Sequence, residues 1–288
     1  MSEREIGWST GGAALRLGLD EEGAGPAVLL LPALSSISTR AEMRPLARRL
    51  APGFRTLGVD WPGFGDRPRP RLDWSPDLLS RFLAEVIAGT GPLAAIVAAG
   101  HAATYALRHL AAHPGSAGRL VLVAPTWRGP LPTMMGGPRP WFARIRAALD
   151  APVLGPMLYA ANLSRFVVER MAREHVYSDP AFLDAARLAE KRGVTTAPGA
   201  RHASVRFVTG ALDRVGEREA FLALLRGAGV PVLLVHGAET PPRSRAEMEA
   251  AAAVPGVAAV QLPRGKLGLH EEFADAVGAE ILAFLSGR

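Results

Sequence analysis

The feature that most constrains the fold is a repeated alternation of short apolar runs with helical patterns. Four short runs in the first half are rich in apolar residues: 27–31, 54–60, 93–99 and 119–124. Stretches with helical spacing of apolar residues separate them: 39–51, 76–88 and the segment that begins GHAAT. Continuous apolar strands are typical of parallel sheets that helices cover on both faces. The first half therefore predicts consecutive βαβ units.

The pattern changes after the fourth run. About one hundred residues then hold helical stretches without a clear strand, and the strand pattern resumes at VLLVH, 232–236. A further strand near 258–262 and a final helix to Leu285 follow. We therefore predict an α/β core that carries an inserted helical cap. The predicted boundaries are 1–125 and 230–288 for the core and 126–229 for the cap.

Composition excludes several classes of protein. The chain has 288 residues, 49% of them hydrophobic, with a net charge of +6, so intrinsic disorder is excluded. It has no cysteine, which excludes disulfides, thiol nucleophiles and iron–sulfur clusters. His109 and His113 have a metal-pair spacing but no accompanying HExxH motif, so we expect neither a metal nor a cofactor. Apolar runs are too short for a transmembrane segment, and no secretory signal is visible, so we expect a cytoplasmic protein.

The basic balance does not point to nucleic acid. Nearly all of the positive charge is arginine, since lysine occurs only at 191 and 266. Acidic residues are interspersed among the arginines, as in the segment 213–219. Nucleic-acid binding normally needs basic side chains gathered on one face. We therefore expect no nucleic-acid partner.

Several segments together resemble the α/β-hydrolase fold. They are the strand ending at Pro32, GVDWPGFGD, GHAAT, RLVLVAP, VLLVHGAET and LHEEF. The resemblance covers essentially the whole chain. It implies a mostly parallel sheet with helices on both faces and an inserted cap. It also implies a site built from a nucleophile, an acid, a base and an oxyanion hole.

The resemblance places Ala102 at the nucleophile position. The family pattern is a small residue, any residue, the nucleophile, any residue and a second small residue, at a sharp strand-to-helix turn. Gly100 to Thr104 fills this pattern with Ala102 at its centre. A methyl group cannot attack a carbonyl, so serine-type hydrolysis is not expected. His101 precedes this position, where we expect it to pack or hydrogen-bond behind the site.

The acid and base positions also depart from the family. Thr240 stands where the family has its aspartate, with Glu239 one residue earlier. Glu239 is either a displaced acid or a solvated loop charge. Lys266 follows a glycine in the histidine context, and His270 lies four residues later. His270 either reaches the site as a base or only begins the final helix.

The oxyanion hole of this fold uses backbone N–H groups, which do not depend on side chains. The resemblance implies that Ala103 and either Ala33 or Leu34 supply them. A pocket that polarises a carbonyl can therefore survive without a nucleophile.

The cap favours an apolar ligand. A dense apolar set is expected beside the site: Met134, Met135, Trp141, Phe142, Ile145, Leu149, Val153, Leu154, Met157 and Leu158. Part of this set must pack the cap onto the core, and the remainder favours an apolar small molecule. A protein partner is a second possibility.

Three functions stay open. The first is a non-catalytic binder or accessory protein that uses the pocket for an apolar, carbonyl-type molecule. The second is acid–base chemistry with oxyanion stabilisation and no covalent step, with His270 as the base. The third is an ester or amide hydrolase in which Ala102 is an inactivating change or the nucleophile is displaced. Ser35, Ser36 and Thr104 are the candidates for a displaced nucleophile.

Overall fold

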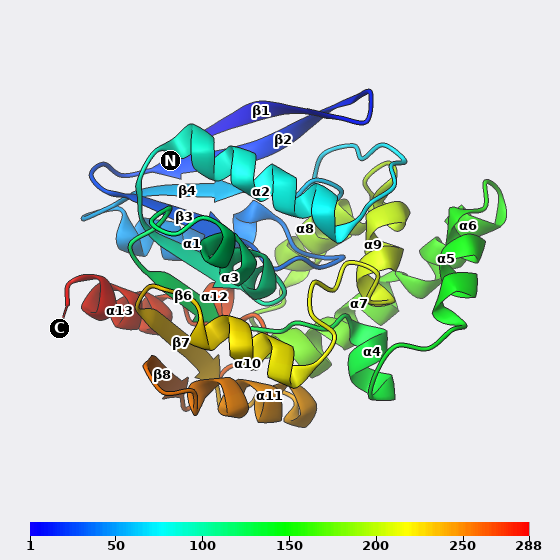
Figure 1. Cartoon of the computed structure of the whole chain (residues 1–288). Helices are drawn as coiled ribbons and strands as arrows, with labels where there is room; N and C mark the ends of the chain where they lie inside the picture. Colours follow the sequence, from blue (N-terminus) through cyan, green and yellow to red (C-terminus); the bar gives the residue numbers. More distant parts are fainter. Residues whose placement is uncertain (288) are drawn as a thin grey trace.

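A computed structural model describes residues 1–287 and contains one eight-stranded sheet, shown in Figure 1. The strand order is β1-β2-β4-β3-β5-β6-β7-β8. The strands are β1 (Ser2–Thr10), β2 (Ala13–Glu22), β3 (Ala27–Leu31), β4 (Arg55–Val59), β5 (Leu93–Ala99), β6 (Leu120–Val123), β7 (Val232–Gly237) and β8 (Val257–Leu262). Strands β3 to β8 form the parallel part, which confirms the predicted mostly parallel sheet.

A hairpin that the sequence analysis did not predict forms one edge of the sheet. Strands β1 and β2 pair antiparallel from Ser2↔Glu21 to Thr10↔Ala13, and β2 continues antiparallel to β4. Gly11 and Gly12 connect the two strands, both with positive φ. Two consecutive residues of that kind form the turn that best matches the twist of a hairpin.

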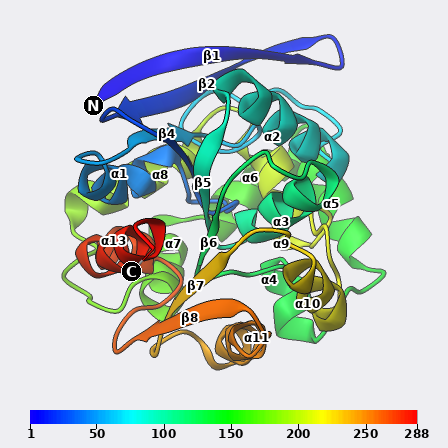
Figure 2. The ribbon, with the colours of Figure 1, turned by 60° about the vertical axis from the view of Figure 1, so that its left-hand side comes forward.

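Helices cover both faces because successive residues of a strand point to opposite sides. In β3, Leu29 and Leu31 join the core under α2 (Pro76–Thr90), α3 (Ala102–Ala112) and α10 (Arg218–Arg226). Val28 and Leu30 join the core under α1 (Arg44–Leu50) and α13 (Ala274–Leu285). Figure 2 shows α2, α3 and α10 on one side of the sheet and α1 and α13 on the other.

The stretch between β6 and β7 is helical, as expected. It holds α4 (Pro130–Met135), α5 (Phe142–Asp150), α6 (Leu154–Asn162), α7 (Arg165–Met171), a π-helical turn η2 (Ala172–Val176), α8 (Ala185–Thr196), α9 (Ala200–Val208) and α10. Helices α5 and α6 project far from the sheet in Figure 1. The last of the series, α10, packs against α3 and α11 (Pro242–Ala252), so it lies on the core. The boundaries of a separate cap domain therefore stay a prediction.

The apolar set of the cap does not form the expected pocket wall. Of its ten members only Phe142 is buried, and seven are exposed, including Val153 at 77% and Met157 at 67%. Only Met134 and Met135 line the cleft described below. Of this set, only these two methionines therefore favour an apolar ligand in the cleft. No helix within residues 1–287 is long and apolar enough to cross a membrane.

Candidate functional site

The sharp turn between β5 and α3 is centred on Gly100. Gly100 has φ +51°, and it is the only residue between Leu93 and Ala112 with a positive φ. Ala102 is instead the first residue of α3 and is fully buried. The prediction that Ala102 occupies the strained turn position is therefore wrong by two residues. The residue at the left-handed position has no side chain.

The surroundings of Gly100 show what a side chain there would meet. A Cβ atom at Gly100 would lie 3.1 Å from the Cβ of Ala33 and 3.9 Å from Oγ1 of Thr126. The backbone oxygen of Gly100 accepts hydrogen bonds from the N–H groups of Ala103 (3.3 Å) and Thr126 (3.1 Å). The predicted oxyanion donor Ala103 is therefore engaged within the turn itself. Leu34, the alternative to Ala33, is fully buried.

The backbone N–H of Ala33 is occupied by a carboxylate. It donates to Oε1 of Glu42 at 2.7 Å, across from the turn at Gly100. Glu42 lies in a short 3₁₀ helix, η1 (Arg40–Met43), and only 3% of its surface is exposed. An oxyanion and a buried carboxylate repel each other, so this donor cannot serve an acyl-transfer intermediate while Glu42 is ionised.

Glu42 belongs to a buried group of ionisable side chains, the Glu42 cluster, which consists of Glu42, Tyr177, Lys191, His270 and Glu271. Nε2 of His270, on α12 (Leu269–Glu272), lies 3.2 Å from Oε1 of Glu42. Nζ of Lys191, on α8, lies 3.0 Å from Oε2 of Glu271 and 3.9 Å from Oε2 of Glu42. The hydroxyl of Tyr177 donates to Glu271 at 2.6 Å. The cluster joins the helical insertion to the core.

The charges of the Glu42 cluster stabilise one another. Burial alone would raise the pKa of Glu42, but His270, Lys191 and the N–H of Ala33 hold it below its usual value. Burial alone would lower the pKa of Lys191, but Tyr177, Glu271 and Glu42 raise it. Glu42 and Lys191 are therefore both ionised at neutral pH, and the fold depends on their remaining together.

The two remaining triad positions hold no acid–base pair. Thr240 is 2% exposed, and its hydroxyl has no hydrogen-bond partner within residues 1–287. Nζ of Lys266 donates to the backbone oxygen of Arg173 at 2.7 Å, in the helical insertion. Glu239 accepts from the N–H of Gly265 at 3.1 Å and so braces the Lys266 loop. These contacts are structural.

His101 lies in a second buried pair. Its Nε2 is 3.3 Å from Oδ1 of Asp213, and its ring packs edge-on against Phe207. Burial lowers the pKa of His101 to about 4 and raises the pKa of Asp213 to about 7. Asp213 also accepts from the N–H of Gly129 at 2.9 Å. His101 is therefore buried between Asp213 and Phe207.

The candidates for a displaced nucleophile do not reach His270. The hydroxyl of Thr104 donates to the backbone oxygen of His101, and that of Ser35 accepts from the N–H of Ile37. The hydroxyl of Ser36 is buried and has no partner in the part of the chain described. None of the three hydroxyls is bonded to His270 within residues 1–287.

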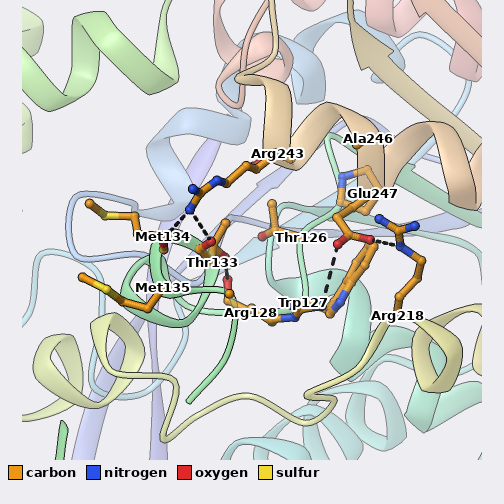
Figure 3. Close-up of a pocket in the computed structure, with 13 residues that line it drawn as sticks. Thr126, Trp127, Arg128, Thr133, Met134, Met135, Arg218, Arg243, Ala246 and Glu247 are labelled. Carbon is orange, nitrogen blue, oxygen red and sulfur yellow. Dashed lines mark hydrogen bonds and ion pairs between the residues drawn. The ribbon is translucent and has the colours of Figure 1, made fainter. Parts of the chain in front are cut away.

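A cleft of about 420 Å³ opens beside the turn (Figure 3). Its lining comes from the segment after β6, from α4 and from the first turns of α10 and α11: Pro125, Thr126, Trp127, Arg128, Thr133, Met134, Met135, Gly136, Arg218, Arg243, Ser244, Ala246 and Glu247. Thr126 links it to the turn, because Thr126 also faces Gly100. Ligands of open α/β sheets bind at the carboxyl ends of the strands, which is where this cleft lies.

The cleft is polar on one side. Arg218 lies 2.5 Å from Glu247, and Arg243 donates to the backbone oxygens of Thr133 and Met134, as Figure 3 shows. Sequence reasoning named His270, Met134 and Met135 but missed the other members of this cleft and of the Glu42 cluster, because nothing in the residues alone indicates which charged side chains fold together. No group of three or more metal-binding side chains occurs within residues 1–287.

Comparisons with known proteins agree with the fold. The sequence model described as the Alpha/beta hydrolase family matches residues 28–280. A search of curated proteins found no match.

Many solved structures are similar over nearly the whole chain. A thermophilic esterase from Thermogutta terrifontis is 17% identical, with 100% of this chain and 99% of that chain covered and a TM-score of 0.72. The epoxide hydrolase CorEH is 16% identical (99% and 99% covered, TM-score 0.74), and the haloalkane dehalogenase DatA from Agrobacterium tumefaciens C58 is 18% identical (99% and 96%, 0.72). At these identities the likeness concerns the fold alone. The family match and the fold together show that this chain belongs to the α/β-hydrolase family.

Proposed function

We propose that this protein binds a small organic molecule without serine-type hydrolysis. The observation that carries the proposal is the carboxylate of Glu42 on the N–H of Ala33, 2.7 Å away. That N–H corresponds to an oxyanion donor of the family, and a carboxylate beside it disfavours a tetrahedral oxyanion. The absence of a side chain at Gly100 supports the same conclusion, because it leaves the turn without a nucleophile.

The binding site we propose is the cleft lined by residues 125–128, α4 and the first turns of α10 and α11. Its volume lies within the range of about 300–1,000 Å³ that is usual for small-molecule pockets. Thr126 lies between this cleft and the turn at Gly100, and this nearness to the turn supports the choice of the cleft. The structural neighbours include enzymes named as an esterase, an epoxide hydrolase and a dehalogenase, all of which act on small molecules.

Turnover of 4-nitrophenyl butyrate tests the proposal. We expect no turnover above the uncatalysed rate from the protein itself or from Ala102→Ser, because residue 102 begins α3 and is fully buried. We also expect none from Gly100→Ser, because Glu42 would still occupy the donor and Lys266 would still be bound to Arg173. Turnover by the unaltered protein above the uncatalysed rate would contradict the proposal.

A second function is favoured by one observation, the buried pair of His270 and Glu42 at 3.2 Å. A histidine held by a carboxylate is the usual arrangement of a general base, so we also propose proton abstraction from a carbonyl compound as the alternative. Deuterium exchange into the α-carbon of cyclohexanone, followed by NMR, separates the two. Exchange that His270→Gln abolishes would favour the enzyme, and no exchange above the buffer rate would favour the binder.

A further inference from the structure

The side chain of Arg128 is mostly buried in the cleft and is poorly satisfied. It is 18% exposed, and it makes no side-chain hydrogen bond within residues 1–287. Its nearest acid is Glu247, whose Oε1 lies 3.7 Å from Nη2, beyond hydrogen-bonding distance. A guanidinium group carries five N–H donors, and buried donors normally have partners. The cleft therefore offers a buried Nε–H without a partner, on a planar cation whose only ion pair is the long one to Glu247 within residues 1–287.

The neighbouring charges strengthen this preference for an anion. Three arginines, Arg128, Arg218 and Arg243, line the cleft with a single acid, Glu247, so the lining has an excess of two positive charges. Arg218 is the first residue of α10, and Arg243 is the second residue of α11. The N-terminal ends of both helices therefore add their partial positive charge to the same space.

The end of α4 adds apolar side chains to the cleft, next to Arg243. Met134 and Met135, at the end of α4, are 58% and 41% exposed although both line the cleft. Trp127 lies on the other side of the cleft, near Arg218 and Glu247, where it is buried and its ring stacks on Phe221 with the centroids 4.2 Å apart. Exposed methionines are flexible, polarisable side chains that fit irregular apolar ligands well.

We propose that the cleft binds a small organic acid, with its carboxylate on Arg128 and its apolar body along Met134 and Met135. The inference rests on the proposed function, in which this cleft is the ligand site. A planar carboxylate matches the fork of one guanidinium group. A phosphate dianion would meet stronger repulsion from Glu247, and it has no apolar body for the methionines to cover.

Isothermal titration calorimetry with three probes tests this inference. The probes are octanoate, the neutral 1-octanol, and inorganic phosphate. The variant is Arg128→Gln, and Arg108→Gln is the matched control, because Arg108 is an exposed arginine on α3 outside the cleft. Arg243→Gln, at an exposed site in the cleft, keeps the test decisive if Arg128→Gln fails to fold.

We expect octanoate to bind at least about tenfold more tightly than 1-octanol or phosphate. We expect Arg128→Gln to weaken the binding of octanoate by at least about tenfold, because hydrogen bonds to a charged group are lost. Arg108→Gln should bind octanoate like the unaltered protein. The inference would be overturned if octanoate did not bind, if 1-octanol bound as tightly as octanoate, or if phosphate bound more tightly. It would also be overturned if neither Arg128→Gln nor Arg243→Gln weakened the binding of octanoate. Ester turnover, which tests the proposed function, is a separate readout, so either idea can fail alone.

Discussion

Replacing Lys191 with methionine should destabilise the protein strongly. Lys191 is 1% exposed, and its ammonium group lies 3.0 Å from Glu271 and 3.9 Å from Glu42. With an effective dielectric constant of about 20, these distances correspond to attractions of roughly 5.5 and 4.3 kcal/mol. Removing the desolvated ammonium group offsets part of that loss. We therefore expect the free energy of unfolding to fall by about 3–5 kcal/mol, as for other buried ion pairs that lose one partner.

The loss of stability in Lys191→Met should become smaller as the pH falls. The pKa of Glu42 is held below its usual value in the folded protein, despite burial, by His270 and Lys191. A depressed pKa stabilises the fold above the pKa of the unfolded chain, and this stabilisation is lost as the pH falls through the folded value. The difference between the unaltered protein and Lys191→Met should therefore be largest near pH 7 and should shrink as the pH falls below about 4.5.

Urea unfolding followed by circular dichroism at pH 7 and at pH 4 measures both effects. Arg192→Met is the matched control, because Arg192 is the next residue on α8 and is exposed. We expect the control to change stability by less than about 0.5 kcal/mol. If Lys191→Met were no more destabilising than Arg192→Met, or equally destabilising at both pH values, our account of the Glu42 cluster would be refuted.

Two other predictions concern single residues near the turn. Burial raises the pKa of Asp213 to about 7, so the folded state retains a proton that the unfolded chain has lost, and stability falls as the pH rises from about 4 to 7. Asp213→Asn cannot titrate, so its stability relative to the unaltered protein should rise over that range by as much as about 4 kcal/mol. Thermal unfolding measured against pH tests this, and a stability difference that does not change with pH would refute it. Gly100→Ala should lose about 1–2 kcal/mol in urea unfolding because of its positive φ, whereas Gly89→Ala, inside α2 with open space around it, should gain about 0.5–1 kcal/mol. A Gly100→Ala variant as stable as Gly89→Ala would show that the turn is not strained.

Much of the fold follows from local pattern. The apolar runs at 27–31 and 93–99 became β3 and β5 with unchanged ends, because their side chains are buried on both faces. The β1–β2 hairpin was missed although Gly11 and Gly12 mark its turn, because its strands alternate only weakly between polar and apolar residues. Local pattern predicts strands well when they are central and less well when they lie at an edge.

The site depends on contacts that local pattern does not contain. Lys191 meets Glu42 and Glu271 across long sequence separations, so no spacing rule could have brought them together. The turn was placed at Ala102 because GHAAT resembles the family pattern, whereas backbone conformation assigns it to Gly100, preceded by the small residues Ala98 and Ala99. The φ angle of Gly100 decides between a turn at residue 100 and a turn at residue 102.

The most direct test of the central claim is intact-mass analysis after incubation with a fluorophosphonate, with an active serine esterase as positive control. The probe forms a covalent bond to an activated serine, which requires a nucleophile, a base and a free oxyanion hole. With glycine at position 100 and Glu42 on the N–H of Ala33, we predict that the mass stays unchanged while the esterase gains one adduct. A stoichiometric adduct on the unaltered protein would contradict the account, and mapping it would identify the nucleophile.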